Sequence, residues 1–225
     1  RELSETIVTD IEAALGDTSF FSSQKGEFAK WYRAATFNAW QALGTGFSKG
    51  AEHLRGAKEW QQMAVRMTGE QGPYPTLLLR MTEDFEPLAD REDLPDWVQT
   101  LYEFQVAKAA GLKGVASKAA ESGKKLLSRI ERRIGAGTST GGSAQNLPGQ
   151  AYQDYKAALA AIAPVAQSRN QAFQFATLVY TEDPATSKSP FYMAQAAGGK
   201  LRSAIMGGRP SDEPVSRLVM GPVDF

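Results

Sequence analysis

Among the adjacent carboxylates of this chain, three pairs have the most versatile chemistry. They are Glu83-Asp84, Glu92-Asp93 and Glu182-Asp183. Two carboxylates held close together can serve as general acid and general base, as they do in glycoside hydrolysis. All three pairs fall near predicted helix ends, where acidic side chains commonly cap a helix or complement its dipole. We therefore keep a carboxylate-based hydrolase as one hypothesis, with Glu83, Asp84, Glu182 and Asp183 as its candidate residues.

Other catalytic and ligand-binding chemistries find little support. His53 is the single histidine and the chain has no cysteine, which excludes a Ser-His-Asp triad, a cysteine nucleophile and a zinc site of ordinary composition. The dipeptides Gly123-Lys124 and Gly199-Lys200 lack the preceding glycine and the following Ser or Thr of a phosphate-binding loop. We expect no catalytic residue, no metal and no cofactor.

Basic residues concentrate in residues 113–133. Lys118, Lys125, Arg129 and Arg132 share one face of the helix predicted there. Such a face can dock an acidic partner or lipid headgroups, and it can equally be the solvated face of an amphipathic helix. No aromatic residues alternate with these charges, so a stacking platform for single-stranded nucleic acid is not supported.

Composition sets the class of protein. The chain has 225 residues, 42% of them hydrophobic and 22% charged, as is usual for a soluble globular fold of one large or two small domains. Its net charge of zero argues against a chain-wide footprint for nucleic acid or an anionic membrane. No apolar run approaches the ~18 residues of a membrane span. The acidic first 15 residues do not resemble a signal peptide. We expect any membrane anchor or targeting signal to lie outside this sequence.

Apolar residues recur at helical spacing along nearly the whole chain, and strand signals are almost absent. This pattern predicts an all-α, elongated multi-helix bundle with short loops. We expect an N-terminal helical subdomain over 1–134, a flexible Gly- and Ser-rich loop over 135–150 and a C-terminal helical subdomain over 151–225. Within this scheme, Phe20-Phe21 is assigned to a turn, and helices are predicted over 51–68 and from Pro75, Pro95 and Pro190. A further helix is predicted from the apolar stripe of Tyr152, Tyr155 and Leu159.

Aromatic residues form a stripe in the predicted helix that follows Glu27. They are Phe28, Trp31, Tyr32, Phe37 and Trp40. Aromatic side chains of this size dominate the energetics of protein cores. We expect the stripe to be packed in the core at one end of the bundle.

One helical pattern occurs twice. In each copy an amphipathic helix ends, a polar turn follows and a proline begins the next helix. Proline is favoured at the first position of a helix because the N–H that it lacks would have no partner there. The first copy contains Trp60–Met63, Pro73-Tyr74-Pro75 and Leu77–Leu79. The second contains Tyr155–Leu159, Ser189-Pro190 and Phe191–Ala194. The chain then stops after a segment, 218–225, that suggests a piece of a longer protein.

Taken in order, these motifs resemble the C-terminal half of the type VI secretion IcmF/TssM family, over most of residues 27–225. The motifs that carry the resemblance are Trp31 and Trp40, Trp60 with Met63, Leu77–Leu79, Tyr152 with Tyr155 and Leu159, Ser189-Pro190, and the closing segment 218–225. The first turn departs from the family, since Tyr74-Pro75 stands where the family has Ser-Pro.

The resemblance implies a role and a place. Proteins of this family are anchored in the inner membrane, and their C-terminal region reaches into the periplasm as a helical stalk followed by a small β-domain. That region assembles with copies of itself, an outer-membrane lipoprotein and an inner-membrane partner. The leading hypothesis is therefore a structural and assembly domain in the periplasm, with the anchor and β-domain outside this chain. The alternative is a helical adaptor that binds an acidic protein through Lys125, Arg129 and Arg132.

Overall fold

The computed structural model describes residues 10, 13–14, 18–88, 94–111, 147–184, 186–206 and 214–225. Within these ranges the chain forms eight α-helices and two short 3-10 helices and contains no strand, which confirms the predicted all-α multi-helix fold. The α-helices are α2 (Thr18–Gly46), α3 (Ala57–Met67), α4 (Pro73–Phe85), α5 (Asp96–Gly111), α7 (Leu147–Gln167), α8 (Arg169–Thr181), α9 (Pro190–Met206) and α10 (Pro214–Asp224). The 3-10 helices are η1 (Phe47–His53) and η2 (Glu86–Leu88).

The chain divides into two compact units, 1–43 and 44–225. Unit 2 holds the helices from both sides of residues 135–150, and α5 packs directly on α7. Residues 135–150 thus separate two stretches of sequence whose helices pack together in one unit. That these residues form a boundary between subdomains stays a prediction. The core that α5 and α7 share is common to both sides of it.

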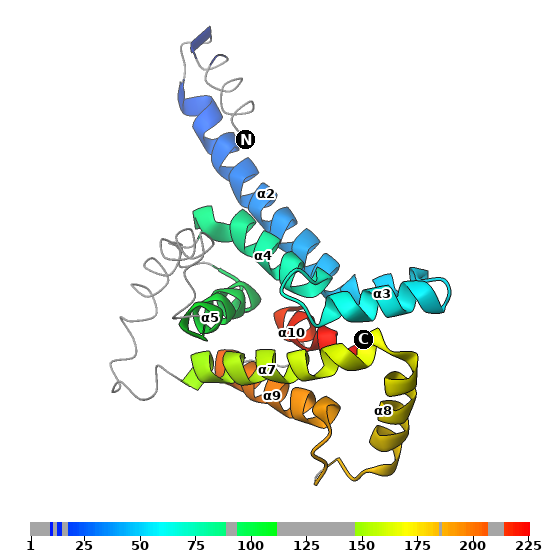
Figure 1. Ribbon diagram of the computed structural model, residues 1–225. Coiled ribbons are helices and arrows are strands. Elements are labelled where there is room, and N and C mark those ends of the chain that lie inside the picture. The colour runs from blue at the N-terminus through cyan, green and yellow to red at the C-terminus, as the bar shows by residue number, and fades with distance from the viewer. Residues whose placement is uncertain are drawn as a thin grey trace. The chain divides into compact units, whose positions relative to one another are not determined.

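The core of unit 2 is built around α7 and α9, which lie side by side (Figure 1). Helix α10 packs against α4, α5 and α9 and places Val215, Leu218 and Val219 in the interior. The core also contains Leu78, Met81 and Phe85 of α4, Val98 and Leu101 of α5, and Leu201 and Ile205 of α9. Burial of such side chains is the main favourable contribution to folding, about 1.5–3 kcal/mol for each large apolar side chain.

Helix starts follow the local sequence rules. Helix α4 begins at Pro73, two residues before the predicted start at Pro75, and α9 begins at Pro190 as predicted, since proline favours a first helical position. The Ser189 hydroxyl accepts a hydrogen bond from the Tyr192 N–H at 3.5 Å and so supports the first turn of α9. Gly56, which precedes α3, has a φ of +82°, a value that glycine adopts without strain.

Several predicted boundaries were wrong. Phe20-Phe21 lies inside α2, which already begins at Thr18. The helix predicted over 51–68 begins only at Ala57, because η1 and an extended link ending at Gly56 precede it. The last four residues of the predicted loop, 147–150, form the first turn of α7. In two of these three places a helix runs through residues that local signals assigned to a turn or loop, and at 51–56 a helix was predicted where the chain forms a 3-10 helix and an extended link.

Candidate functional site

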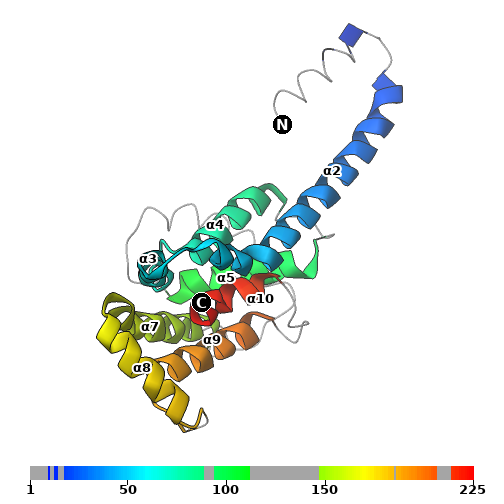
Figure 2. The same ribbon diagram turned by 90° about the vertical axis from the view of Figure 1, so that its right-hand side faces the viewer.

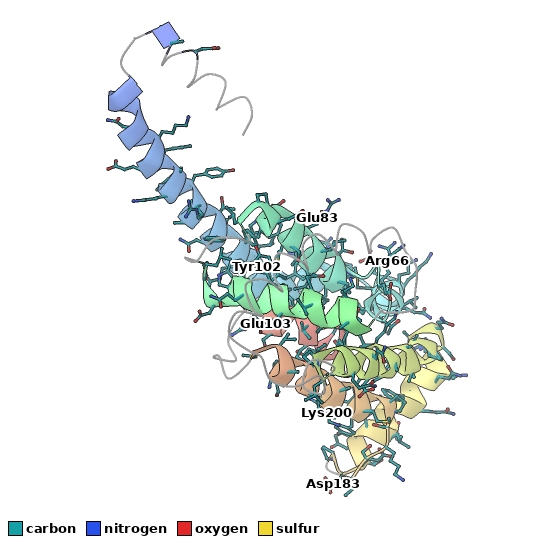
Figure 3. The ribbon with its side chains drawn as sticks, turned by 90° about the vertical axis from the view of Figure 1, so that its left-hand side faces the viewer. Arg66, Glu83, Tyr102, Glu103, Asp183 and Lys200 are labelled. Atoms are coloured by element: carbon teal, nitrogen blue, oxygen red, sulfur yellow. The ribbon has the colours of Figure 1, made fainter. Side chains whose placement is uncertain are left out.

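The basic face predicted at Lys118, Lys125, Arg129 and Arg132 lies outside the described residues, and so does the pair Glu92-Asp93. Both stay predictions from the sequence. The other two acidic pairs are described, and Figure 3 shows Glu83 and Asp183 at opposite ends of unit 2. Glu83 forms an exposed ion pair with Arg80 at 2.7 Å, and Glu182 accepts a hydrogen bond from the Ser187 hydroxyl. These carboxylates therefore do not converge on one site.

Helix α8 lies at one edge of unit 2, across the ends of α7 and α9 (Figures 1 and 2). It is well formed locally. The Ser168 hydroxyl accepts a hydrogen bond from the Gln171 N–H at 3.4 Å, and the Glu182 N–H donates to the Leu178 carbonyl at 3.0 Å. The Tyr192 hydroxyl of α9 donates to the Val179 carbonyl at 3.1 Å and ties the two helices together.

Helix α8 nevertheless buries none of its residues. Phe173 is 74% exposed and Tyr180 is 92% exposed. Residues seven apart return to the same side of an α-helix, so Phe173 and Tyr180 lie on one side with Ala176 and Thr177 between them. We call these four residues the α8 face. The helix carries a single charged residue, Arg169, so the α8 face is uncharged, and its two large exposed side chains are aromatic.

A second exposed apolar surface occurs on α2 and corrects a prediction. Phe28, Trp31 and Tyr32 are exposed rather than packed in the core, Trp31 by 64%, and Phe37 alone of the predicted stripe is buried. The ring centre of Phe28 lies 5.8 Å from that of Trp31 and 6.0 Å from that of Tyr32. The spacing showed correctly which side of the helix is apolar, but spacing alone does not say whether another element covers that side.

Unit 2 also contains a small hollow, of about 50 Å³, between the α3–α4 turn, α5 and α7. Its charged and phenolic lining residues are Glu70, Lys108, Tyr152, Tyr155 and Lys156. A water molecule needs about 10–15 Å³ of such space, so the hollow has room for only a few water molecules or one small ion. Pockets that take drug-sized ligands are typically ~300–1,000 Å³.

Close approach of two helices brings these residues together. A Cβ at Gly111 of α5 would lie 2.7 Å from the Gly149 carbonyl oxygen of α7, so glycine is needed where the two backbones meet. The Gln153 side chain of α7 donates to the Gly111 carbonyl at 2.6 Å. One turn before this crossing, Lys108 faces the side of α7 that carries Tyr152 and Lys156, and all three line the hollow.

Electrostatics couple the lining groups. The Lys156 ammonium donates a hydrogen bond to the Glu70 carboxylate, and this bond holds the pKa of Glu70 below its usual value. Burial lowers the pKa of Lys108, the nearby charge of Lys156 lowers it further and Glu70 opposes both effects. Burial, aided by the charge of Glu70, raises the pKa of Tyr152 to about 12.

The lining of the hollow was missed at the level of the sequence. Tyr152 and Tyr155 were recognised only as part of an apolar helical stripe. The sequence did contain one signal, a lysine one helical turn after an aromatic residue in two of the predicted helices. Lys108 follows Phe104, and Lys156 follows Tyr152. Glu70 comes from a turn far away in the sequence and carried no such signal.

Comparison with known proteins gives no further guide, since no family model, curated protein or solved structure matches this chain. None of the helices in the described ranges combines the length and apolar character needed to cross a membrane. In the same ranges no group of three or more His, Cys, Asp or Glu residues comes together as a metal site. The described features that remain distinctive are the uncovered apolar face of α8, the aromatic surface of α2 and the charged hollow.

Proposed function

We propose that this chain is a structural and assembly domain of a type VI secretion membrane complex, in the periplasmic part of an inner-membrane protein, and that it contacts neighbouring subunits through the α8 face. The observation that carries the assembly role is that α8 buries none of its residues and leaves the rings of Phe173 and Tyr180 exposed. Larger uncovered apolar patches on soluble proteins commonly mark binding surfaces.

Energetics favour a partner on this face. Covering a large apolar side chain yields about 1.5–3 kcal/mol, and Phe173 and Tyr180 both present most of their surface to solvent. Aromatic residues are enriched at the centres of protein interfaces. Helix α8 has 13 residues, and isolated helices of up to about 12–15 residues are marginal in water. A neighbouring subunit that covers the α8 face would therefore stabilise the helix as well as the complex.

The assignment to a secretion complex is supported by the resemblance of residues 27–225 to the IcmF/TssM family. The all-helical fold of the described residues is of the kind that the resemblance implies for a stalk. The partners proposed on this basis are further copies of the chain, the outer-membrane lipoprotein and the inner-membrane subunit. The account needs no cofactor and no nucleic acid.

The proposal is tested by photo-crosslinking in cells that make the intact protein. A photoreactive amino acid at Phe173 or Tyr180 should form adducts with other envelope components of the secretion complex or with a second copy of this protein. The same probe at Arg80, an exposed position on α4, serves as the control for proximity alone. Adducts only with cytoplasmic proteins would refute the periplasmic assignment and favour the adaptor hypothesis.

A further inference from the structure

The hollow of unit 2 has a feature that packing alone does not explain. Tyr152 is buried, at 8% exposure, and its hydroxyl has no hydrogen-bond partner among the described residues. Lys108 is half-buried, and its ammonium likewise has no hydrogen-bond partner in the described part of the chain. A buried hydroxyl or ammonium without a partner is costly, and most such groups in proteins are hydrogen-bonded.

The charged residues that line the hollow carry a net positive charge. Lys108 and Lys156 bring two positive charges from α5 and α7, and Glu70 brings one negative charge from the α3–α4 turn. The carboxylate of Glu70 is already bonded to Lys156. One positive charge therefore remains beside a hollow lined elsewhere by apolar side chains, among them Leu78 and Phe104.

We propose that this hollow binds a small oxyanion, a carboxylate or phosphate group, held by Lys108 and Tyr152 with Lys156 at its edge. An ammonium and a phenol both donate hydrogen bonds, and an oxyanion accepts them. The volume of about 50 Å³ admits a group of a few heavy atoms and is too small to enclose a whole nucleotide or sugar. The inference goes beyond the assembly role and does not depend on it.

The apolar walls increase the effect of this arrangement. Charge-assisted hydrogen bonds are stronger where the surroundings exclude water, because the local dielectric constant is lower. A bound anion would also offset the influences that lower the pKa of Lys108, which are its burial and the positive charge of Lys156. Binding should therefore raise the pKa of Lys108, which gives the proposal a readout besides affinity.

The test is a titration of the 225-residue chain with sodium phosphate and, separately, with sodium acetate, at pH 7 and at ionic strength matched with sodium chloride. Calorimetry should show saturable binding in the millimolar range for at least one of the two anions. Preference for acetate would identify a carboxylate, such as an acidic side chain of a partner, and preference for phosphate would identify a phosphate group. The proposal would be overturned if neither anion gave a saturating heat of binding after subtraction of the heat measured with sodium chloride alone.

Variants locate the binding. Lys108→Met should weaken it at least tenfold and Tyr152→Phe several-fold, whereas Lys58→Met, which removes an exposed lysine of α3, should leave it unchanged. Equal binding by Lys108→Met and the unchanged chain would refute the assignment to this hollow. The pKa of Lys108 can be measured by NMR on the unchanged chain labelled with ¹³C-lysine, so this test needs no variant that could misfold. That pKa should be higher in a solution of the anion that binds than in sodium chloride of the same ionic strength, and a constant value would refute the proposal.

Discussion

The phenolic hydroxyl of Tyr155 donates a hydrogen bond of 2.5 Å to the backbone carbonyl of Val219, which lies 64 positions later in the sequence. Both residues are buried. The bond joins α7 to α10 and so fixes the C-terminal helix in the core of unit 2. Burial raises the pKa of Tyr155 well above its ordinary value, so the donor keeps its proton at alkaline pH as well.

Replacement of Tyr155 by Phe should remove this bond while retaining the ring. We expect the free energy of unfolding to fall by about 0.5–1.5 kcal/mol, the usual net contribution of an intramolecular hydrogen bond. Urea unfolding followed by circular dichroism measures the change. Tyr32→Phe, at an exposed position of α2, is the control and should stay within about 0.5 kcal/mol of the unchanged chain. Equal effects of the two substitutions would show that the bond to Val219 contributes nothing.

Two adjacent glycines of α9 should respond in opposite directions to alanine. A Cβ at Gly198 would lie 2.8 Å from the Met220 sulfur and 3.0 Å from the Tyr155 ring, whereas a Cβ at Gly199 would have no neighbour within 4 Å. Gly198→Ala should destabilise the chain by about 1–3 kcal/mol through overpacking. Gly199→Ala should stabilise it by up to about 1 kcal/mol, because alanine is the better helix former. Thermal unfolding of both variants tests the expectation, and stabilisation by Gly198→Ala would contradict the close approach of α9 to α7 and α10.

Alkaline pH should weaken the fold through Tyr152. Burial raises the pKa of Tyr152 from 10.0 to about 12. Between these two pH values the unfolded chain loses the phenolic proton and the folded chain keeps it, so stability is complete below pH 10 and is lost as the pH rises toward 12. A difference of two pH units corresponds to roughly 3 kcal/mol. The stability of Tyr152→Phe should therefore fall less steeply above pH 10 than that of the unchanged chain.

Urea titrations between pH 8 and pH 11 measure this difference. Tyr180→Phe removes a phenol that is 92% exposed and is the matched control. Its stability should follow the same pH dependence as that of the unchanged chain. A Tyr152→Phe variant that loses stability with rising pH as steeply as the control would contradict the burial of the Tyr152 hydroxyl.

Helix α8 should open far more readily than its neighbours. It buries no residue, and the Tyr192 hydroxyl is the side chain of α9 that bonds to its backbone. Segments with few buried contacts open locally at a small fraction of the global free energy. Amide hydrogen exchange should therefore be faster in α8 than in α7 and α9, and faster again in Tyr192→Phe. Protection of α8 equal to that of α9 in the isolated chain would show that the helix does not need a partner.

Local signals in the sequence were enough to predict much of the fold. Proline at Pro190 and the apolar stripe of Tyr152, Tyr155 and Leu159 each act within one or two helical turns, and both predicted helices are present. The prediction that Phe28, Trp31 and Tyr32 are buried was wrong because burial depends on elements elsewhere in the chain. A stripe shows which side of a helix is apolar and does not show what covers it.

The candidate sites were harder to predict for the same physical reason. Glu70, Lys108 and Lys156 come from three elements, and only the crossing of α5 and α7 at Gly111 and Gly149 brings two of them together. The spacing in the sequence contains no information on that crossing. The α8 face was invisible as a site because Phe173 and Tyr180 have the ordinary spacing of core residues. Only their exposure distinguishes them.

The most direct test of the proposed function is photo-crosslinking from Phe173 and Tyr180 of α8 in the intact protein, in cells with an assembled secretion complex. The account predicts adducts with envelope subunits of that complex or with a second copy of this protein, at yields well above those from Arg80. It also predicts that a Phe173→Ser, Tyr180→Ser double variant folds normally and fails to assemble. Normal assembly of the double variant, with no adducts from either position of α8, would contradict the central claim.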